Sequence, residues 1–149
     1  MPGCGKSTLG RLLAAELGKD FYDADEALVK ITGRSIPDIF RCDGEDAFRR
    51  LETKTLFALT QKTGCVIATG GGAVTRPENE MLLRQNGRVL FLDIPPEGLS
   101  VAGRPLSQAR TPEVLYRERL PLYRKMADIT VPITHDIKEN LARIKEALL

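Results

Sequence analysis

Six consecutive residues near the start of the chain combine glycines with a lysine and two hydroxyl side chains, the residue types that bind phosphate. They read Gly3-Cys4-Gly5-Lys6-Ser7-Thr8. Glycines let a loop turn its N–H groups toward phosphate oxygens, and the helix that follows adds the positive end of its dipole. Lys6 can reach the β- and γ-oxygens of ATP, and Ser7 can ligate Mg²⁺. The run therefore predicts an ATP-binding P-loop, and a glycine turn that merely caps a helix is the alternative.

The P-loop signature is incomplete in the sequence as given. Its first glycine belongs five residues before Gly5, at a position that precedes Met1, and the hydrophobic strand that leads into such a loop is also absent. That strand lies centrally in a doubly wound sheet, so we expect its neighbours to be unpaired and a slot in the core to be empty. We interpret this as a shortened reading frame or a trimmed record rather than a working design.

Two aspartates, Asp23 and Asp25, follow closely on a short predicted strand over residues 21–23. Ligands of open α/β sheets bind beyond the carboxyl ends of the strands, so these carboxylates lie where chemistry would take place. One could hold the shell of a Mg²⁺ ion while the other takes a proton from an attacking hydroxyl group. The structural alternative is that one aspartate caps the next helix, while the other lies in its first turn and is stabilised by the positive end of the helix dipole.

Arginines and glycines supply further candidates. A planar guanidinium can grip a carboxylate or phosphate with two hydrogen bonds, which makes Arg49, Arg104 and Arg119 candidates. Arg49 could instead pair with Glu52, three residues later on a helix. The run Gly70-Gly71-Gly72 follows a strand directly, and it costs backbone entropy unless a ligand must approach the main chain closely. A plain strand-to-helix turn is the alternative for these glycines.

The elements that must position these residues alternate between strand and helix from end to end. Apolar runs predict strands over residues 21–23, 65–68, 88–93 and 128–131. Helical spacing predicts helices over residues 6–17, 26–32, 46–61, 77–85, 112–125 and 136–149, a short helix between Ser35 and Gly44, and an interruption at Pro121. We therefore predict an α/β fold of three layers, α/β/α, with a mostly or fully parallel sheet and a single domain over residues 1–149.

The composition excludes several classes of protein. The 149 residues carry 22 basic and 20 acidic side chains, and a net charge of only +2 gives no reason to expect a nucleic-acid partner. No apolar run approaches the ~20 residues of a membrane span, and no leader-like segment opens the sequence. Three cysteines, Cys4, Cys42 and Cys65, lack metal-binding spacing and suit a reducing compartment. We expect a cytoplasmic protein without nucleic-acid or membrane partners.

Six motifs in a fixed order resemble the shikimate kinase family. They read G-C-G-K-S-T, F-Y-D-A-D, G-E-D-A-F-R-R-L-E, A-T-G-G-G-A-V, R-P-L and R-L-P-L-Y-R-K-M-A-D, and they span residues 3 to about 131. The resemblance implies a P-loop kinase that uses ATP and Mg²⁺ to phosphorylate the 3-hydroxyl of shikimate, in aromatic amino-acid (chorismate) biosynthesis. We also expect a monomer.

The resemblance implies roles on the nucleotide side of the site. The ATP phosphates would be bound by Gly3, Cys4, Gly5, Lys6, Ser7 and Thr8. Lys6 would also be catalytic, and Ser7 with Asp23 would hold the metal. Arg104, which opens R-P-L, matches a catalytic lid arginine that closes over the nucleotide and the transferring phosphate. The lid itself would span residues 104–111, and its closure would exclude water.

On the substrate side the resemblance makes Asp25 the residue that hydrogen-bonds shikimate hydroxyls and serves as base. Arg49 and Arg119 match arginines that bind the substrate carboxylate. The glycines implied to contact substrate through the backbone are Gly70, Gly71 and Gly72, with Gly71 central.

The chain departs from the family pattern around the lid. The segment between Asp93 and Arg104 is short, the basic run before R-P-L is reduced to Val101-Ala102-Gly103, and Ser107 stands where family members often have leucine. Two alternatives to an active shikimate kinase therefore stay open. One is a truncated or degenerate paralogue that binds ligand without turnover, and the other is a related small-metabolite kinase such as a gluconate kinase.

Overall fold

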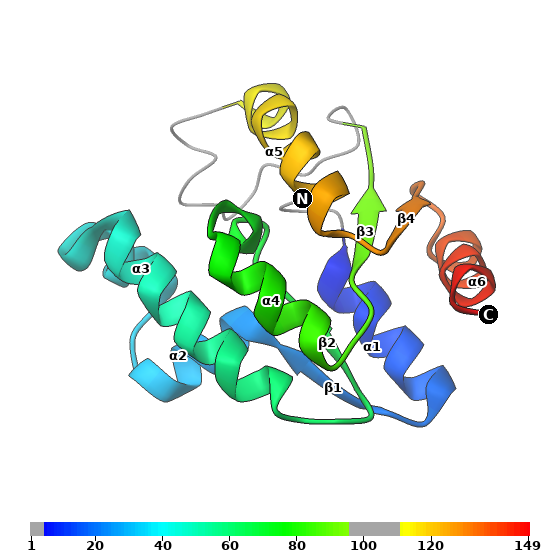
Figure 1. Ribbon diagram of the computed structural model, residues 1–149, viewed down its shortest axis with the longest axis horizontal. Helices are drawn as coiled ribbons and strands as arrows, with labels where there is room; N and C mark the ends of the chain where they lie inside the picture. Colours follow the sequence, from blue (N-terminus) through cyan, green and yellow to red (C-terminus); the bar gives the residue numbers. More distant parts are fainter. Residues whose placement is uncertain (1–4, 96–110) are drawn as a thin grey trace.

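Four short strands form two parallel pairs in the computed structural model, which describes residues 5–95 and 111–149 (Figure 1). Strand β1 (Asp20–Asp23) pairs with β2 (Cys65–Ala68), with Asp20 opposite Cys65 and Asp23 opposite Ala68. Strand β3 (Leu90–Asp93) pairs in the same way with β4 (Ile129–Pro132). Every strand pairing among the described residues is parallel, as the alternation of strands and helices predicts.

Helices lie on both sides of these strands, which gives the expected three layers (Figure 1). On one side, α1 (Lys6–Leu17) packs against β1, β2 and α6 (Ile137–Leu148). On the other side, α3 (Ile36–Thr60) packs against both α2 (Ala24–Thr32) and α4 (Pro77–Gln85). The short 3-10 helix η1 (Ala73–Thr75) follows the triple glycine and contacts α5 (Pro112–Met126).

Two helices differ from their prediction in where the helix is continuous. Helix α3 runs as one element through Gly44, where φ is 83° and ψ is 174°, so the two predicted helices meet at a kink. Glycine adopts this left-handed φ without the steric cost that a side chain brings. Pro121 lies inside α5 and does not interrupt it, although proline removes one backbone hydrogen bond. The prediction of an interruption was therefore wrong.

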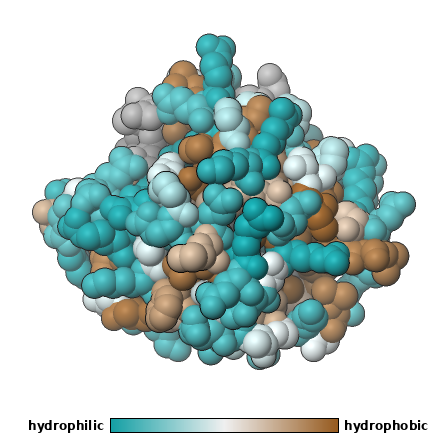
Figure 2. Space-filling view, viewed as in Figure 1, coloured by the Kyte–Doolittle hydropathy of each residue, from teal (hydrophilic) through white to brown (hydrophobic). Residues whose placement is uncertain are grey.

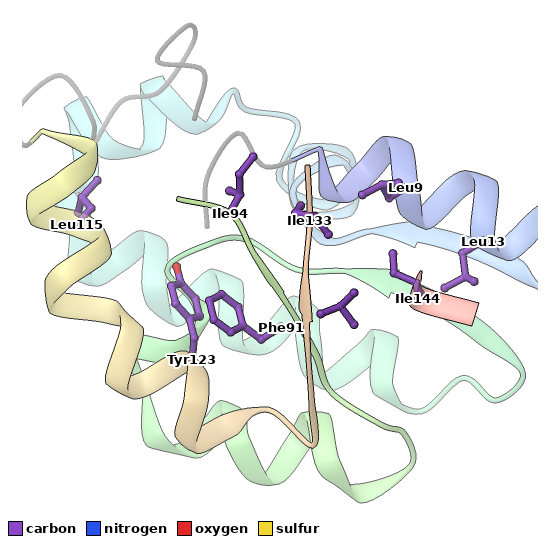
Figure 3. Packing of buried hydrophobic residues seen from close by; sticks show 9 residues of the cluster. Leu9, Leu13, Phe91, Ile94, Leu115, Tyr123, Ile133 and Ile144 are labelled. Carbon is purple, nitrogen blue, oxygen red and sulfur yellow. The ribbon is translucent and has the colours of Figure 1, made fainter. Parts of the chain in front are cut away.

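The empty slot expected in the sheet is present. Strands β2 and β3 belong to separate sheets with no ladder between them in the described chain. A cavity of about 430 Å³ separates them, and its apolar lining includes Leu9 and Leu13 of α1, Val66 of β2 and Phe91 of β3. The largest buried cluster surrounds this space (Figure 3). Ile144 of α6 belongs to this cluster and also lines the cavity.

The surface of the protein is mainly polar in the view of Figure 2. Hydrophilic side chains cover most of the face in Figure 2, and the hydrophobic ones form separate patches. No described helix is long and apolar enough to cross a membrane. The predicted lid falls outside the described residues except for Thr111, which caps α5 by accepting a hydrogen bond from the Val114 amide at 3.4 Å.

Candidate active site

The nucleotide side of the site is the N-terminus of α1. Gly5 caps this helix with φ 77° and ψ 20°, a left-handed conformation that glycine favours, and the helix begins at Lys6. Lys6 and Ser7 therefore stand in the first turn, where unpaired N–H groups and the helix dipole attract anions. Thr8 is exposed in the same turn. Gly3, Cys4 and Arg104 lie outside the described residues, so their predicted roles stay predictions.

Asp23 links β1 to the phosphate-binding helix. One carboxylate oxygen, Oδ2, accepts a short hydrogen bond from the Ser7 hydroxyl. The other, Oδ1, accepts from the amides of Asp25 at 2.9 Å and Glu26 at 3.2 Å, so it caps α2. The capping alternative is thus correct for Asp23, and the same side chain also reaches the residue predicted to bind metal. Side-chain oxygens of this kind are hard ligands that suit Mg²⁺.

Asp25 stands in the first turn of α2 with its carboxyl group among other charges. Partial loss of hydration raises the pKa of Asp25, and the neighbouring Asp23 carboxylate raises it further. The positive charges of Lys6 and Arg49 lower the pKa of Asp25, so both cations lie near this carboxyl group. Solvent still reaches the Asp25 side chain. A carboxyl group with a raised pKa next to a phosphate-binding lysine is a candidate for proton transfer.

Arg49 and Glu52 form a buried ion pair one turn apart on α3. The distance from Arg49 Nη1 to Glu52 Oε2 is 2.7 Å. The pairing with Glu52 that was the alternative for Arg49 is therefore present, and it is buried rather than exposed to solvent. Loss of hydration raises the pKa of Glu52, while Arg49 and, more weakly, Arg119 act to lower it. Arg49 Nε and Glu52 Oε1 are both buried, and neither has a hydrogen-bond partner in the described structure.

The triple glycine makes room for these charged side chains. A β-carbon at Gly72 would overlap the Arg49 guanidinium, and one at Gly70 would overlap Glu52 Oε1 and lie 3.2 Å from Asp25 Oδ1. The protein's own side chains thus approach two of the three glycines closely, which accounts for them without a ligand. The same contacts bring together the loop after β2, the start of α2 and the middle of α3.

Helix α5 closes the site from another direction. Arg119 is buried on this helix, at 7% exposure, and its charge acts on Glu52. One turn further on, the Tyr123 hydroxyl donates a short hydrogen bond to the Gly71 carbonyl. The Tyr123 ring stacks on Phe91 of β3, with ring centroids 4.9 Å apart (Figure 3). Tyr123 therefore connects the glycine loop to the core beneath it.

Sequence reasoning did not assign site roles to Glu52 and Tyr123. Both occur within the quoted motifs, Glu52 closing G-E-D-A-F-R-R-L-E and Tyr123 following R-L-P-L. The spacing of Arg49 and Glu52 signals an ion pair but not its burial. Nothing in the local sequence signals that the Tyr123 hydroxyl reaches Gly71, because that contact joins residues 52 positions apart.

Comparison with known proteins assigns this arrangement to a family. The family model for shikimate kinase matches residues 2–149. A shikimate kinase of Thiobacillus denitrificans is 42% identical, over 95% of this chain and 82% of the relative. The chain belongs to the shikimate kinase family. Another shikimate kinase, of Halorhodospira halophila, is 45% identical over 98% of this chain and 88% of the relative.

Solved shikimate kinase structures share the fold. The structure from Acinetobacter baumannii, solved in complex with shikimate, superposes with a TM-score of 0.92 at 38% identity, covering 99% of this chain and 88% of that one. The structure from Aquifex aeolicus gives a TM-score of 0.85 at 36% identity, covering 98% and 90%. The predicted family and α/β fold are confirmed, and the gluconate kinase alternative gains no support from these relatives.

Proposed function

We propose that the chain transfers the γ-phosphate of ATP to the 3-hydroxyl of shikimate, giving shikimate 3-phosphate and ADP. One observation carries this proposal: Asp25, the buried Arg49–Glu52 pair and the Gly70 loop converge on one another beside Lys6. A phosphate-binding helix end thus adjoins groups that suit a hydroxylated carboxylic acid. The relatives named shikimate kinase support this substrate, as does the Acinetobacter baumannii complex with shikimate.

The transfer step uses groups from α1 and α2. The substrate oxygen forms a bond to the γ-phosphorus while the bond from that phosphorus to the β–γ bridging oxygen breaks and ADP leaves. Asp25 takes the hydroxyl proton, and its raised pKa favours this uptake. Lys6, with Arg104 closing from the lid, neutralises charge on the transferred group, since phosphoryl transfer depends mainly on positioning and electrostatics.

Two buried arginines bind the substrate carboxylate in this proposal. Arg49 is oriented by Glu52, and Arg119 comes from α5 to the same cluster. A guanidinium that is already fixed and desolvated binds a carboxylate with less loss of entropy than a mobile one. The backbone of Gly71, held through its carbonyl by Tyr123, supplies a further contact.

Ser7 and Asp23 would hold Mg²⁺ together with the phosphates of ATP. Their side-chain oxygens already contact each other at the start of α1, which fits a hard cation with few protein ligands. When bound, the ion would neutralise phosphate charge and orient the β- and γ-phosphoryl groups.

A coupled assay of ADP release tests the proposal. ADP formation that depends on both ATP and shikimate is expected, and ADP formation with gluconate is not. The second candidate, a degenerate paralogue without turnover, is favoured by the gap between β2 and β3 beside α1. It would be supported by a calorimetric titration in which shikimate binds while ATP neither binds nor turns over.

Two further expectations concern the cellular compartment and the oligomeric state of the enzyme. We propose a cytoplasmic monomer, a setting that the two described cysteines, both free, suit. Light scattering on a size-exclusion column gives the mass in solution. A mass of twice the 16.5 kDa of one chain would overturn the monomer.

A further inference from the structure

Tyr123 connects the two buried arginines of the site through the glycine loop. Its hydroxyl donates a short hydrogen bond to the Gly71 carbonyl. The next residue of the loop, Gly72, lies directly against the Arg49 guanidinium, which a β-carbon at Gly72 would overlap. On α5, Tyr123 follows Arg119 by four residues, so the two buried side chains share one face of the helix. A continuous series of contacts therefore runs from Arg49 through the loop to the helix that carries Arg119.

The middle of the glycine loop depends on Tyr123 for its orientation. The carbonyls of Gly70 and Gly72 accept hydrogen bonds from the backbone amides three residues later, at 3.2 Å and 3.0 Å, so the turn itself holds them. The Gly71 carbonyl accepts from no backbone amide of the described chain, and Tyr123 holds it instead. Because the peptide group is planar, fixing this carbonyl also fixes the direction of the Gly72 N–H.

The Tyr123 side chain is itself held firmly. Its ring stacks on Phe91, with centroids 4.9 Å apart and ring planes inclined by 13°, inside the largest buried cluster (Figure 3). A close-packed aromatic ring gives its hydroxyl a fixed position. On the other side of the loop, the fully buried Asn79 of α4 donates from Nδ2 to the Ala73 carbonyl at 2.8 Å. The loop and the start of η1 are thereby attached to both α5 and α4.

Two arginines that bind one carboxylate need an enforced spacing. Like charges repel, so the surrounding structure must keep the two guanidinium groups close to a shared anion. Glu52 fixes Arg49 on α3, and the hydrogen bond from Tyr123 fixes α5 relative to the loop that packs on Arg49. A neutral group in place of the carboxylate gains little from this spacing. The spacing therefore favours an acid over its uncharged ester.

We propose that Tyr123 is a positioning residue that gives the site its preference for a carboxylate substrate, because it keeps Arg49 and Arg119 at a fixed spacing through the Gly71 carbonyl. This inference rests on the proposed function. Loss of the Tyr123 hydroxyl loosens the spacing, so it weakens binding of the charged substrate more than binding of the neutral ester. The contacts made by the substrate hydroxyls and by ATP do not depend on it.

The test compares shikimate with its neutral methyl ester in the Tyr123→Phe variant, which keeps the ring that stacks on Phe91. The kcat/KM preference for shikimate over the ester is expected to fall by roughly fivefold, the size that one hydrogen bond supplies, while KM for ATP changes little. Asn86→Ala is the matched control, because it removes another side-chain hydrogen bond to a distant carbonyl, that of Thr60 at 3.1 Å. An unchanged preference in Tyr123→Phe, or an equal fall in Asn86→Ala, would overturn the proposal.

A double variant tests whether Tyr123 acts through the arginines. In an Arg119→Ala background, Tyr123→Phe should lower the remaining preference for shikimate by less than about twofold, because residues that act together have non-additive effects. A full fivefold fall in that background would exclude the route through Arg119.

A measurement without substrate separates this inference from the proposed function. Hydrogen exchange at the Ala73 and Thr75 amides, which donate within the turn, should be roughly fivefold faster in Tyr123→Phe and unchanged in Asn86→Ala. If this difference is observed but the unchanged protein does not phosphorylate shikimate, the proposed function is wrong and the hold of Tyr123 on the loop is supported. Equal exchange rates in Tyr123→Phe and the unchanged protein would overturn the positioning role even in an active enzyme.

Discussion

The Arg49 guanidinium and the Glu52 carboxylate are joined by an ion pair that solvent barely reaches. Arg49 Nη1 lies 2.7 Å from Glu52 Oε2, and the exposed fractions of the two side chains are 6% and 2%. The second nitrogen, Nη2, lies 3.4 Å from Oε1 of Glu45 at the kinked turn of α3. The guanidinium is thereby fixed from two sides before any substrate binds.

Removing Glu52 should destabilise the fold and the substrate site together. Glu52→Ala is expected to lower the free energy of unfolding by roughly 3–5 kcal/mol, because it leaves Arg49 buried and unpaired. Glu52→Gln should cost less stability and still weaken shikimate binding. Urea denaturation and shikimate titration measure the two effects. Glu16→Gln, which removes an exposed ion pair with Lys145, is the control and should change neither. Equal losses in control and variant would contradict this account.

Gly72→Ala should weaken the binding of shikimate and leave the binding of ATP unchanged. The added methyl group overlaps the Arg49 guanidinium, so that side chain must move from its position beside Glu52. We expect KM for shikimate to rise by tenfold or more while KM for ATP changes little. Gly87→Ala is a matched control, since its β-carbon would meet no atom closer than the Leu83 carbonyl at 3.7 Å. An unchanged KM for shikimate in Gly72→Ala would show that Arg49 does not bind the substrate.

Asp25→Asn should abolish turnover while ATP binding is retained. Loss of the base is expected to lower kcat by about 10²–10⁴-fold. In the unchanged protein the pKa of Asp25 is raised, so kcat/KM should fall with decreasing pH at a point above the ordinary value of 3.8. Steady-state rates between pH 4 and 8 and a nucleotide titration check both statements. Normal kinetics in Asp25→Asn would refute the assignment of the base.

Stability should depend on pH through the same cluster. The folded-state pKa values of Asp25 and Glu52 are both raised above 3.8 and 4.5. The folded protein therefore binds more protons than the unfolded chain in the window that begins at these values and extends upward. Their contribution is fully present below the window and is lost as the pH rises through it. Urea unfolding of Asp25→Asn and Glu52→Gln should be measured from pH 4 to 7. In each variant the free energy of unfolding should depend less steeply on pH than in the unchanged protein. A slope identical to that of the unchanged protein would contradict the prediction.

Arg119→Ala should weaken shikimate binding by roughly 2–5 kcal/mol, because a buried charge that pairs with the substrate carboxylate is lost. Arg119→Lys keeps the charge without the planar fork and should recover only part of this loss. Arg117→Ala, an exposed arginine on the same helix, is the control. Calorimetric titration with shikimate measures all three. Similar affinities for Arg117→Ala and Arg119→Ala would remove Arg119 from the site.

Local patterns predicted the elements of this fold well. The strand at residues 65–68 and the helices at 6–17 and 77–85 have the predicted bounds, since each is bounded by glycine or proline or by a clear change of periodicity. Pro121 misled the prediction, because packing of α5 outweighs one missing hydrogen bond. In the site, Asp25 lies beside Gly70 and Arg49 beside Gly72, while their roles toward a substrate stay predictions. The burial of Glu52 and the reach of Tyr123 to Gly71 depend on how α3 and α5 pack, which spacing along one helix cannot reveal.

The register of the two sheets has a consequence for how the chain reaches its native state. Both ladders join residues that are distant in the chain: Asp20 pairs with Cys65, and Leu90 pairs with Ile129. Closing such long loops is slow relative to the formation of helices, so the helices should gain protection first in a refolding experiment. The turn at Gly44 lies inside the loop that must close before β1 meets β2. A bulkier residue there should delay refolding, even where the finished enzyme works normally.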